Sequence, residues 1–101
     1  MLKAEKRMEK GALIISLEGR LDTLSSPGFE AELEPLLADA ESLTIDFEKL
    51  EYISSAGLRV LLMAAQVLEE KGAGMVRVVN SNDTIRNIFV MAGFTDFLLV
   101  E

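Results

Sequence analysis

Apolar and polar residues alternate in several short stretches of the chain, the pattern of strands that bury one face. In the stretch ALIISLEGRLD, Leu13, Ile15 and Leu17 share one face of a strand, opposite a more polar face. The same alternation recurs in SLTIDF and, over fewer residues, in MVRVV and DFLLV. These patterns predict strands over residues 12–22, 42–47, 75–79 and 96–100. A weaker strand is predicted over 3–9, joined to the next by a hairpin turn at Lys10 and Gly11.

Between these strands, apolar residues recur at intervals of three and four, the spacing of an amphipathic helix. The first such segment is SSPGFEAELEPLLAD, in which we expect Ser26 as the N-cap and Pro27 at the first helical position. Pro35 removes a hydrogen bond from this helix, so we expect a kink or an irregular last turn there. The predicted core stripe comprises Phe29, Leu33, Leu36 and Leu37.

Two further helices are predicted after the later strands. One covers residues 56–71 and stops at Gly72, and the other runs from a cap at Ser81 or Asn82 to Gly93. The residues expected to face the core are Leu58, Leu61, Leu62, Ala65 and Leu68 in the first, and Ile85, Ile88, Phe89 and Ala92 in the second.

The order of these elements predicts the fold class. Strands that alternate with helices favour parallel pairing with right-handed crossovers, while the N-terminal hairpin adds one antiparallel strand. No repeat or flexible linker divides the 101 residues. We therefore expect a single α/β domain over 1–101, with a mostly parallel sheet of four to five strands and three to four helices.

Composition removes several classes of function. The chain has neither Cys nor His, which excludes thiol catalysis, disulfides and Cys/His zinc sites. Its formal net charge of −7 opposes binding to nucleic acid. No apolar run approaches the roughly 20 residues of a membrane span, and the charged start lacks a signal-peptide core. We expect a cytoplasmic protein that is not membrane-embedded. An enzyme or a loose Mg²⁺ site is still open on composition, but it would have to be built on Asp and Glu alone.

Short polar side chains follow each of the longer predicted strands. In open parallel sheets, functional groups gather beyond the carboxyl ends of the strands, so these side chains are expected at one edge. They are Asp22 and Thr23 after the first long strand, Asp46, Ser54 and Ser55 after the second, and Asn80 and Ser81 after the third.

Ser55 lies at the predicted start of the second helix, where two interpretations are open. Its hydroxyl could accept a hydrogen bond from a free helix N–H, as serine caps commonly do. Alternatively, it could be phosphorylated, because the N–H groups and dipole of a helix start accept an anion. A phosphate would then change the surface of the domain and leave it folded. The two roles are compatible.

Two features near Ser55 bear on partner binding. Arg59, one turn further on, could pair with Glu51, could simply be solvated, or could meet a phosphate or a partner's carboxylate. The side of the helix opposite the expected core stripe is apolar, where a surface helix should be polar. Either a neighbouring element covers this side or it is exposed and docks a partner; its residues are Val60, Met63, Ala64 and Val67.

Three segments of the chain resemble the STAS domain of bacterial anti-sigma factor antagonists. They are LEGRLDTLSSPGFEAEL, IDFEKLEYISSAGLRVLL and VRVVNSNDTIRNIFVMAGF, which occur in the family's order and span essentially the whole chain. The strand–loop–helix run from Asp46 to Leu62 is the most specific of them. Many members have Asp directly before the phosphorylated serine, and this chain has Ser54 in that place.

The resemblance implies a partner switch. An unphosphorylated antagonist binds an anti-sigma factor that is also a serine kinase, phosphorylation releases it, and a serine phosphatase resets it. The family's serine precedes a small residue and Gly-Leu, which places it on Ser55 and not on Ser54. ATP and Mg²⁺ would belong to the kinase, so the resemblance implies a protein that is not itself an enzyme and needs no cofactor or metal. The residues expected to contact the partner are Asp22, Thr23, Ser54, Ser55, Ala56, Gly57, Arg59, Val60, Met63 and Val67.

Two other functions are weighed against this one. The first is a constitutive STAS-like accessory subunit of a lipid-transport or other membrane ATPase complex, which binds through the second helix without phosphorylation. The second is a metal-dependent enzyme built on Asp22 and Asp46, although no spacing in the chain resembles a known carboxylate site.

Overall fold

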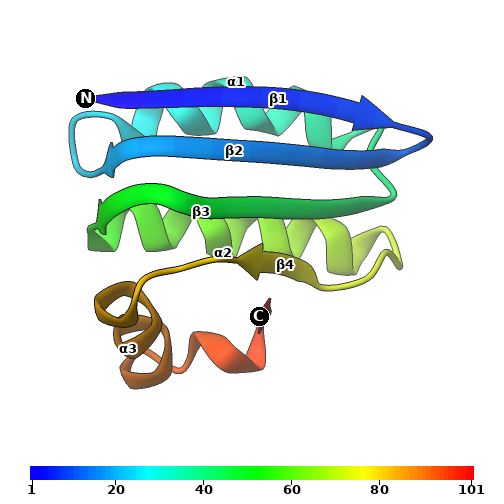
Figure 1. The fold of residues 1–101 in the computed structure, drawn as a ribbon. Helices are drawn as coiled ribbons and strands as arrows, with labels where there is room; N and C mark the ends of the chain where they lie inside the picture. The colour runs from blue at the N-terminus through cyan, green and yellow to red at the C-terminus, as the bar shows by residue number, and fades with distance from the viewer.

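A five-stranded sheet forms the centre of the computed structural model, which describes residues 1–101. The strands lie in chain order; β1 runs antiparallel to β2, and the other neighbours are parallel. Helices α1 and α2 cover one face of the sheet, and α3 follows β4 (Figure 1). The elements are β1 (Leu2–Glu9), β2 (Ala12–Leu21), α1 (Ser26–Leu37), β3 (Ser42–Ile53), α2 (Ser55–Glu70), β4 (Val76–Val79), α3 (Asp83–Met91), a short 3-10 helix (Phe94–Asp96) and β5 (Leu98–Val100).

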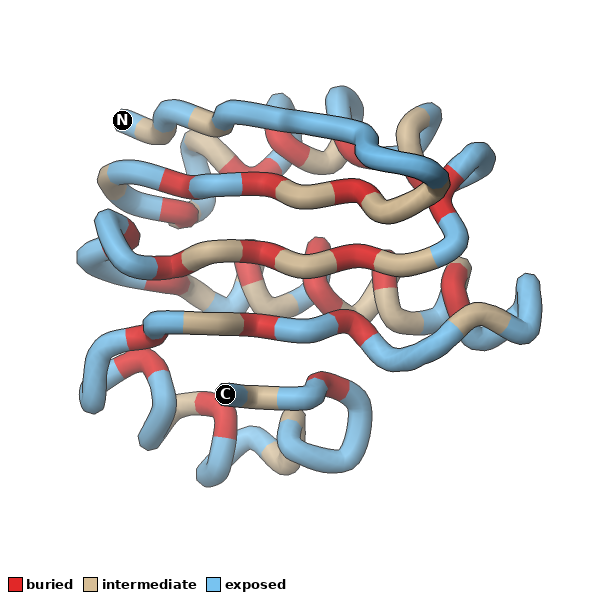
Figure 2. Tube along the Cα trace, turned by 45° about the vertical axis from the view of Figure 1, so that its right-hand side comes forward, coloured by how far each residue is buried: buried red, intermediate tan, exposed pale blue.

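The alternating strand pattern produces the buried face of the sheet, as predicted. Figure 2 shows buried residues at every second position along most of β2 and the first half of β3, whereas β1 is largely exposed. The two central strands pair in register, with Leu13 beside Leu43 and Ile15 beside Ile45. All four side chains are at most 1% exposed, so they form the middle of the core. The α/β fold class predicted from the sequence is confirmed.

Strand β3 is twice as long as the pattern predicts, so the expected loop over residues 48–53 is wrong. Its pairing with β2 shifts twice, between Ser16 and Glu18 and again between Gly19 and Arg20. Each shift places an extra residue of β3 against β2, as in a β-bulge. The buried residues beyond Phe47 are therefore Leu50 and Ile53, spaced by three. A search for period-two alternation misses a strand interrupted in this way.

Helix α1 begins one residue earlier than predicted. Ser25 takes the N-cap position and Ser26 is already helical, so the assignment of Ser26 as the cap is wrong. The helix passes through Pro35 and ends at Leu37. Pro35 has no N–H to donate to the carbonyl four residues earlier, so the last turn of the helix is held by one hydrogen bond fewer.

The inward face of α2 differs from the predicted face. Val60 and Ala64, expected on the outer side, are at most 1% exposed, whereas Leu58 and Leu62 are only half-buried. The helix packs against α1 as well as against the sheet (Figure 1), so a wider arc of its surface is covered. Of the two alternatives, cover by a neighbouring helix is confirmed for Val60 and Ala64, and the exposed apolar patch is wrong for them; Met63 and Val67 are half-buried against the core.

The C-terminal third follows the prediction closely. Asn82 caps α3 by accepting a hydrogen bond from the N–H of Ile85 at 2.8 Å, and Gly93 follows the helix with φ of 76°. Ile85 and Phe89 are buried, but Ala92 is exposed, which corrects its placement in the core. None of the helices is both long and apolar enough to cross a membrane.

Candidate functional site

Helices α1 and α2 start side by side at one edge of the sheet. The ends of β2 and β3 pair at Leu21 and Ile53, and the Ser54 N–H donates to the Leu21 carbonyl at 2.9 Å. The turn that follows β2 therefore lies next to the turn that follows β3. The predicted meeting of Asp22 with Ser54 and Ser55 at one sheet edge is confirmed at the level of the backbone.

The third predicted segment does not reach this edge. Strand β4 is only four residues long and ends opposite the middle of β3, where Asp46 pairs with Val79. Asn80 follows at once and its Nδ2 donates to Asp46 Oδ1 at 3.1 Å. Asp46, Asn80 and Ser81 thus form a separate polar group halfway along the sheet, which corrects their placement beside Ser55.

Ser54, and not Ser55, caps α2. Its backbone is extended, and its Oγ accepts a hydrogen bond from the Gly57 N–H at 3.4 Å. Ser55 is the first helical residue; its side chain is exposed, and its hydroxyl has no hydrogen-bond partner in the chain. The N–H groups of Ser55 and Ala56 lie in the first turn, where a helix offers no internal acceptor. Ser55 thus presents a free hydroxyl beside free backbone donors.

Gly57 fixes how closely α2 approaches the sheet. It is buried, and a Cβ at this position would lie 2.9 Å from the Leu21 carbonyl oxygen and 2.8 Å from Ile53 Cγ1. Neither distance is tolerable for a carbon atom, so only glycine allows this contact. Gly57 therefore contributes to packing, and its backbone and Val60 are too buried to form the surface expected to meet a partner.

Asp22 organises the neighbouring turn. Its Oδ1 accepts hydrogen bonds from the N–H groups of Leu24 at 3.1 Å and Ser25 at 3.0 Å. The bond from the Ser25 backbone is the largest cause that lowers the pKa of Asp22 below its usual value, and the Ser25 hydroxyl lowers it further. Arg20 Nε lies 3.8 Å from Asp22 Oδ2. Asp22 is thus held as a carboxylate that shapes the turn.

Three residues at this edge carry no signal in the sequence pattern. Leu24 is 91% exposed at the tip of the Asp22 turn. The Arg20 guanidinium stacks over the ring of Tyr52, 4.4 Å from its centroid, near the end of β3. The exposure of Leu24 could have been suspected only from its place as an isolated leucine in a polar turn. The contact between Arg20 and Tyr52 could not be predicted, because it depends on their pairing across two bulges.

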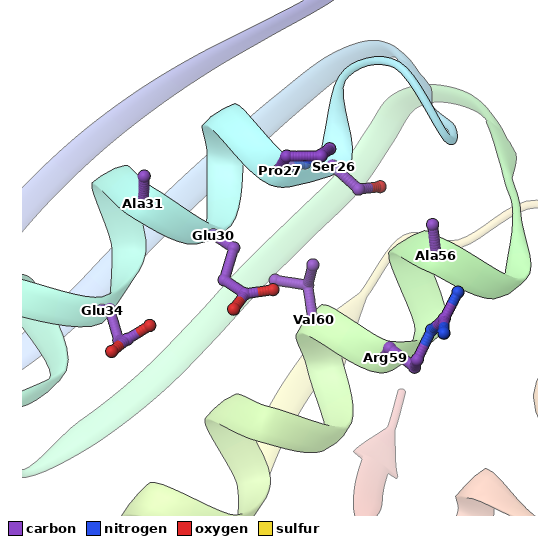
Figure 3. Close-up of a pocket in the computed structure, with 8 residues that line it drawn as sticks. All are labelled: Ser26, Pro27, Glu30, Ala31, Glu34, Ala56, Arg59 and Val60. Atoms are coloured by element: carbon purple, nitrogen blue, oxygen red, sulfur yellow. The ribbon is translucent and has the colours of Figure 1, made fainter.

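Arg59 lines a cleft between the two helices. The cleft has a volume of about 490 Å³ and lies between the first three turns of α1 and the first two turns of α2 (Figure 3). Arg59 is exposed and forms no ion pair within 4.0 Å, so the predicted pair with Glu51 is wrong, while the predicted alternative of a solvated side chain agrees with the structure. Two carboxylates, those of Glu30 and Glu34, line the α1 side of the same cleft.

The residues expected to contact a partner thus differ in how far their side chains are exposed. Those with exposed side chains are Thr23, Ser55 and Arg59; those half-buried are Asp22, Ser54, Ala56, Met63 and Val67; Gly57 and Val60 are buried. The structure brings together no group of three or more carboxylates that could hold a metal ion.

Known proteins share both the sequence and the fold of this chain. A family model described as Mlab, STAS domain matches residues 4–101. The chain is 34% identical over 85 residues to BtrV of Bordetella bronchiseptica, named as an anti-sigma factor antagonist; the match covers 83% of this chain and 72% of that protein.

Two solved structures are similar at lower identity. An anti-sigma factor antagonist from Mycobacterium paratuberculosis has a TM-score of 0.86 and 21% identity, with 99% of this chain and 85% of that chain covered. The phosphorylated form of SpoIIAA, a Bacillus cell fate determinant, has a TM-score of 0.78 and 20% identity, with 98% and 91% covered. At these identities the structures establish a shared fold. The chain therefore belongs to the STAS domain family and is a relative of the bacterial anti-sigma factor antagonists.

Proposed function

We propose that this protein is a cytoplasmic anti-sigma factor antagonist whose binding is switched by phosphorylation of Ser55. In its unmodified form it binds an anti-sigma factor with serine kinase activity, and the kinase uses its own ATP and Mg²⁺ to modify Ser55. A serine phosphatase restores the binding form. The observation that carries this proposal is the exposed, unbonded hydroxyl of Ser55 at the first position of α2.

The surroundings of Ser55 suit a phosphate. The first turn of α2 contains no acidic residue, so no carboxylate of that turn opposes the added negative charge. The free N–H groups of this turn can donate to phosphate oxygens. Because the Ser55 hydroxyl makes no hydrogen bond within the chain, a phosphate changes the charge of the surface and leaves the domain folded. SpoIIAA in its phosphorylated form has this fold, which is consistent with such a switch.

Release follows from where the charge is added. A phosphate carries about −1.5 to −2 charges at neutral pH, on a protein whose formal net charge is already −7. It stands beside Ala56 and one turn from Arg59, on the surface expected to meet the partner. A partner that packs closely on the unmodified hydroxyl must then accommodate the bulk and desolvation of a phosphate, which favours dissociation.

Binding of Ser55 variants to the kinase tests the proposal. The kinase is the anti-sigma factor recovered from native extract on the immobilised protein, and its affinity is then measured by calorimetry. Ser55→Ala should bind like the unmodified protein but should not be released by ATP, whereas Ser55→Asp should bind at least about tenfold more weakly.

Thr84→Asp is the matched control, because it adds the same charge to the exposed first turn of α3 and should leave the affinity unchanged. Equal affinity of Ser55→Ala and Ser55→Asp for the recovered kinase would contradict the switch. Circular dichroism of each variant shows that the fold is retained.

A constitutive accessory subunit is the second candidate. It is favoured by one observation: the matching family model carries the description Mlab and not that of an antagonist. In this case α2 would bind a membrane ATPase complex regardless of the state of Ser55. Recovery of such a complex, with the same yield from Ser55→Ala and Ser55→Asp, would support this candidate over the switch.

A further inference from the structure

Ser26 has a buried hydroxyl that no group in the chain satisfies. The residue is 2% exposed, and its Oγ has no hydrogen-bond partner. Buried hydroxyls are nearly always bonded, because an unpaired one loses its bonds to water without replacement. The backbone of Ser26 is anchored, since its N–H donates to the Asp22 carbonyl at 2.9 Å. Ser81 Oγ is also buried without a partner, but of the two serines only Ser26 lines a cleft, so only its hydroxyl could be satisfied by a bound group.

The hydroxyl points into the cleft between α1 and α2. In Figure 3 the Ser26 oxygen is directed from α1 toward the first turn of α2, across from Ala56. The cleft, of about 490 Å³, is lined by the apolar side chains of Ala31, Ala56 and Val60 between its polar groups. This combination of an apolar lining and a polar inner end suits an amphipathic side chain.

The α1 wall of the cleft carries unpaired negative charge. Glu30 is half-buried and its carboxylate points into the cleft (Figure 3), with Glu34 one turn further along the same wall. Neither forms an ion pair, whereas Glu32, on the other side of the helix, pairs with Lys6 at 3.1 Å. Arg59 stands on the opposite wall with its guanidinium turned toward Ala56, and no carboxylate lies within 4.0 Å of it.

We propose that this cleft receives an arginine side chain of the partner protein. The guanidinium bonds to the Glu30 carboxylate and donates to the Ser26 hydroxyl at the inner end, while the aliphatic stem lies along the half-buried Ala56. Arginine fits better than lysine because its planar group presents five donors in a fixed fork, which can reach a carboxylate and a hydroxyl together. An acidic side chain in the cleft would be repelled by Glu30, and a purely apolar one would leave the Glu30 carboxylate without a partner.

The inference rests on the proposed function for the identity of the partner, which is the anti-sigma factor. Ala56 lines the cleft and directly follows Ser55, so one partner surface can cover both. The arginine then contributes affinity and register, while Ser55 determines whether the partner is held.

A titration with N-acetyl-arginine amide, followed by amide NMR shifts, tests the cleft without the partner. Saturable shifts are expected at residues of the first turns of α1 and α2. The neutral isostere N-acetyl-citrulline amide should produce none. Glu30→Gln should weaken binding about three- to fivefold, while Glu32→Gln, the matched control on the same helix, should not. Shifts spread over the acidic surface, or equal affinity in Glu30→Gln and Glu32→Gln, would overturn the proposal.

Ser26→Ala separates a binding role from a structural one. Because the hydroxyl is unpaired in the free protein, its removal should raise the melting temperature while it weakens binding of the arginine probe about threefold. A lower melting temperature, or an unchanged affinity, would count against the inference. The probe assay involves neither Ser55 nor the kinase. A negative probe assay would therefore not contradict the phosphorylation switch, and a negative test of the switch would not contradict arginine binding in the cleft.

Discussion

Helices α1 and α2 begin with nearly the same four residues, Ser-Ser-Pro-Gly over 25–28 and Ser-Ser-Ala-Gly over 54–57. Both follow parallel strands at one sheet edge, and in both the first serine holds the N-cap position. The next residues differ in exposure. In α1 the second serine is buried and the glycine meets nothing within 4 Å; in α2 the second serine is exposed and the glycine is buried against Leu21.

This contrast shows that packing, and not the local motif, determines which hydroxyl is available. Helix α2 presses its third residue onto the sheet edge, which turns its first residue outward. Helix α1 presses its first residue inward and leaves its third free. The active site of a kinase can therefore enclose the exposed Ser55 but not Ser26, whose hydroxyl lies at the inner end of the cleft, although both follow a serine and start a helix. The predictions below test this difference, from the largest effect to the smallest.

The two glycines should respond to alanine in opposite directions. Gly57→Ala places a Cβ 2.9 Å from the Leu21 carbonyl oxygen, and overpacking of this kind destabilises by about 1–3 kcal/mol. Gly28→Ala has open space around it and should stabilise α1 by up to about 1 kcal/mol through helix propensity. Urea denaturation at neutral pH measures both. Effects of the same sign would mean that the two helix starts are not packed differently.

Alanine substitution of Ser54 and of Ser55 should also change the stability of the protein by different amounts. Ser54→Ala removes the acceptor of the Gly57 N–H, and loss of a serine cap costs about 1 kcal/mol. Ser55→Ala removes an exposed hydroxyl without a partner, so the free energy of unfolding should change by less than about 0.5 kcal/mol. Thermal unfolding of the pair provides the comparison. A larger loss in Ser55→Ala than in Ser54→Ala would reassign the cap.

Substitution of Asp22 by Asn should have the smallest effect on stability, and this effect should depend on pH. Its folded pKa is lowered from 3.8, chiefly by the Ser25 backbone bond, so the ionised carboxylate stabilises the turn above that value. This stability is lost as the pH falls through the lowered folded pKa. The urea midpoint of Asp22→Asn should therefore lie below that of the wild type at pH 7, and the gap should narrow as the pH falls below 3.8.

Asp39→Asn, at an exposed aspartate without an ion pair, is the control and should leave the midpoint unchanged at neutral pH. A gap between Asp22→Asn and the wild type that stays constant across this range would show that the charge of Asp22 does not support the turn.

Periodicity predicts the regular parts of this fold and fails where pairing is irregular. The alternation in β2 and the cap of α3 depend on local chemistry that the residues display. The second half of β3 could not be predicted, because two register shifts against β2 set its buried positions. The face of α2 was predicted wrongly for Val60 because burial there depends on α1, a neighbour that a single helix pattern does not contain.

The candidate site shows the same division. Ser55 and Asp22 could be selected from their positions after two strands, and the resemblance to antagonists distinguished Ser55 from Ser54. Which serine caps the helix could not be predicted, since both are good caps and the boundary differs by one residue. The unpaired hydroxyl of Ser26 is a tertiary property, and only the packing of α1 against α2 reveals it.

Phosphate mapping tests the central claim most directly. The protein is recovered from its native cells in growth and in starvation, and its intact mass and peptides are measured. A single phosphate on Ser55 that varies with condition, with none on Ser25, Ser26 or Ser54, is the predicted result. A phosphate on Ser54 or Ser26, or no phosphate under either condition, would contradict the account and favour a constitutive subunit.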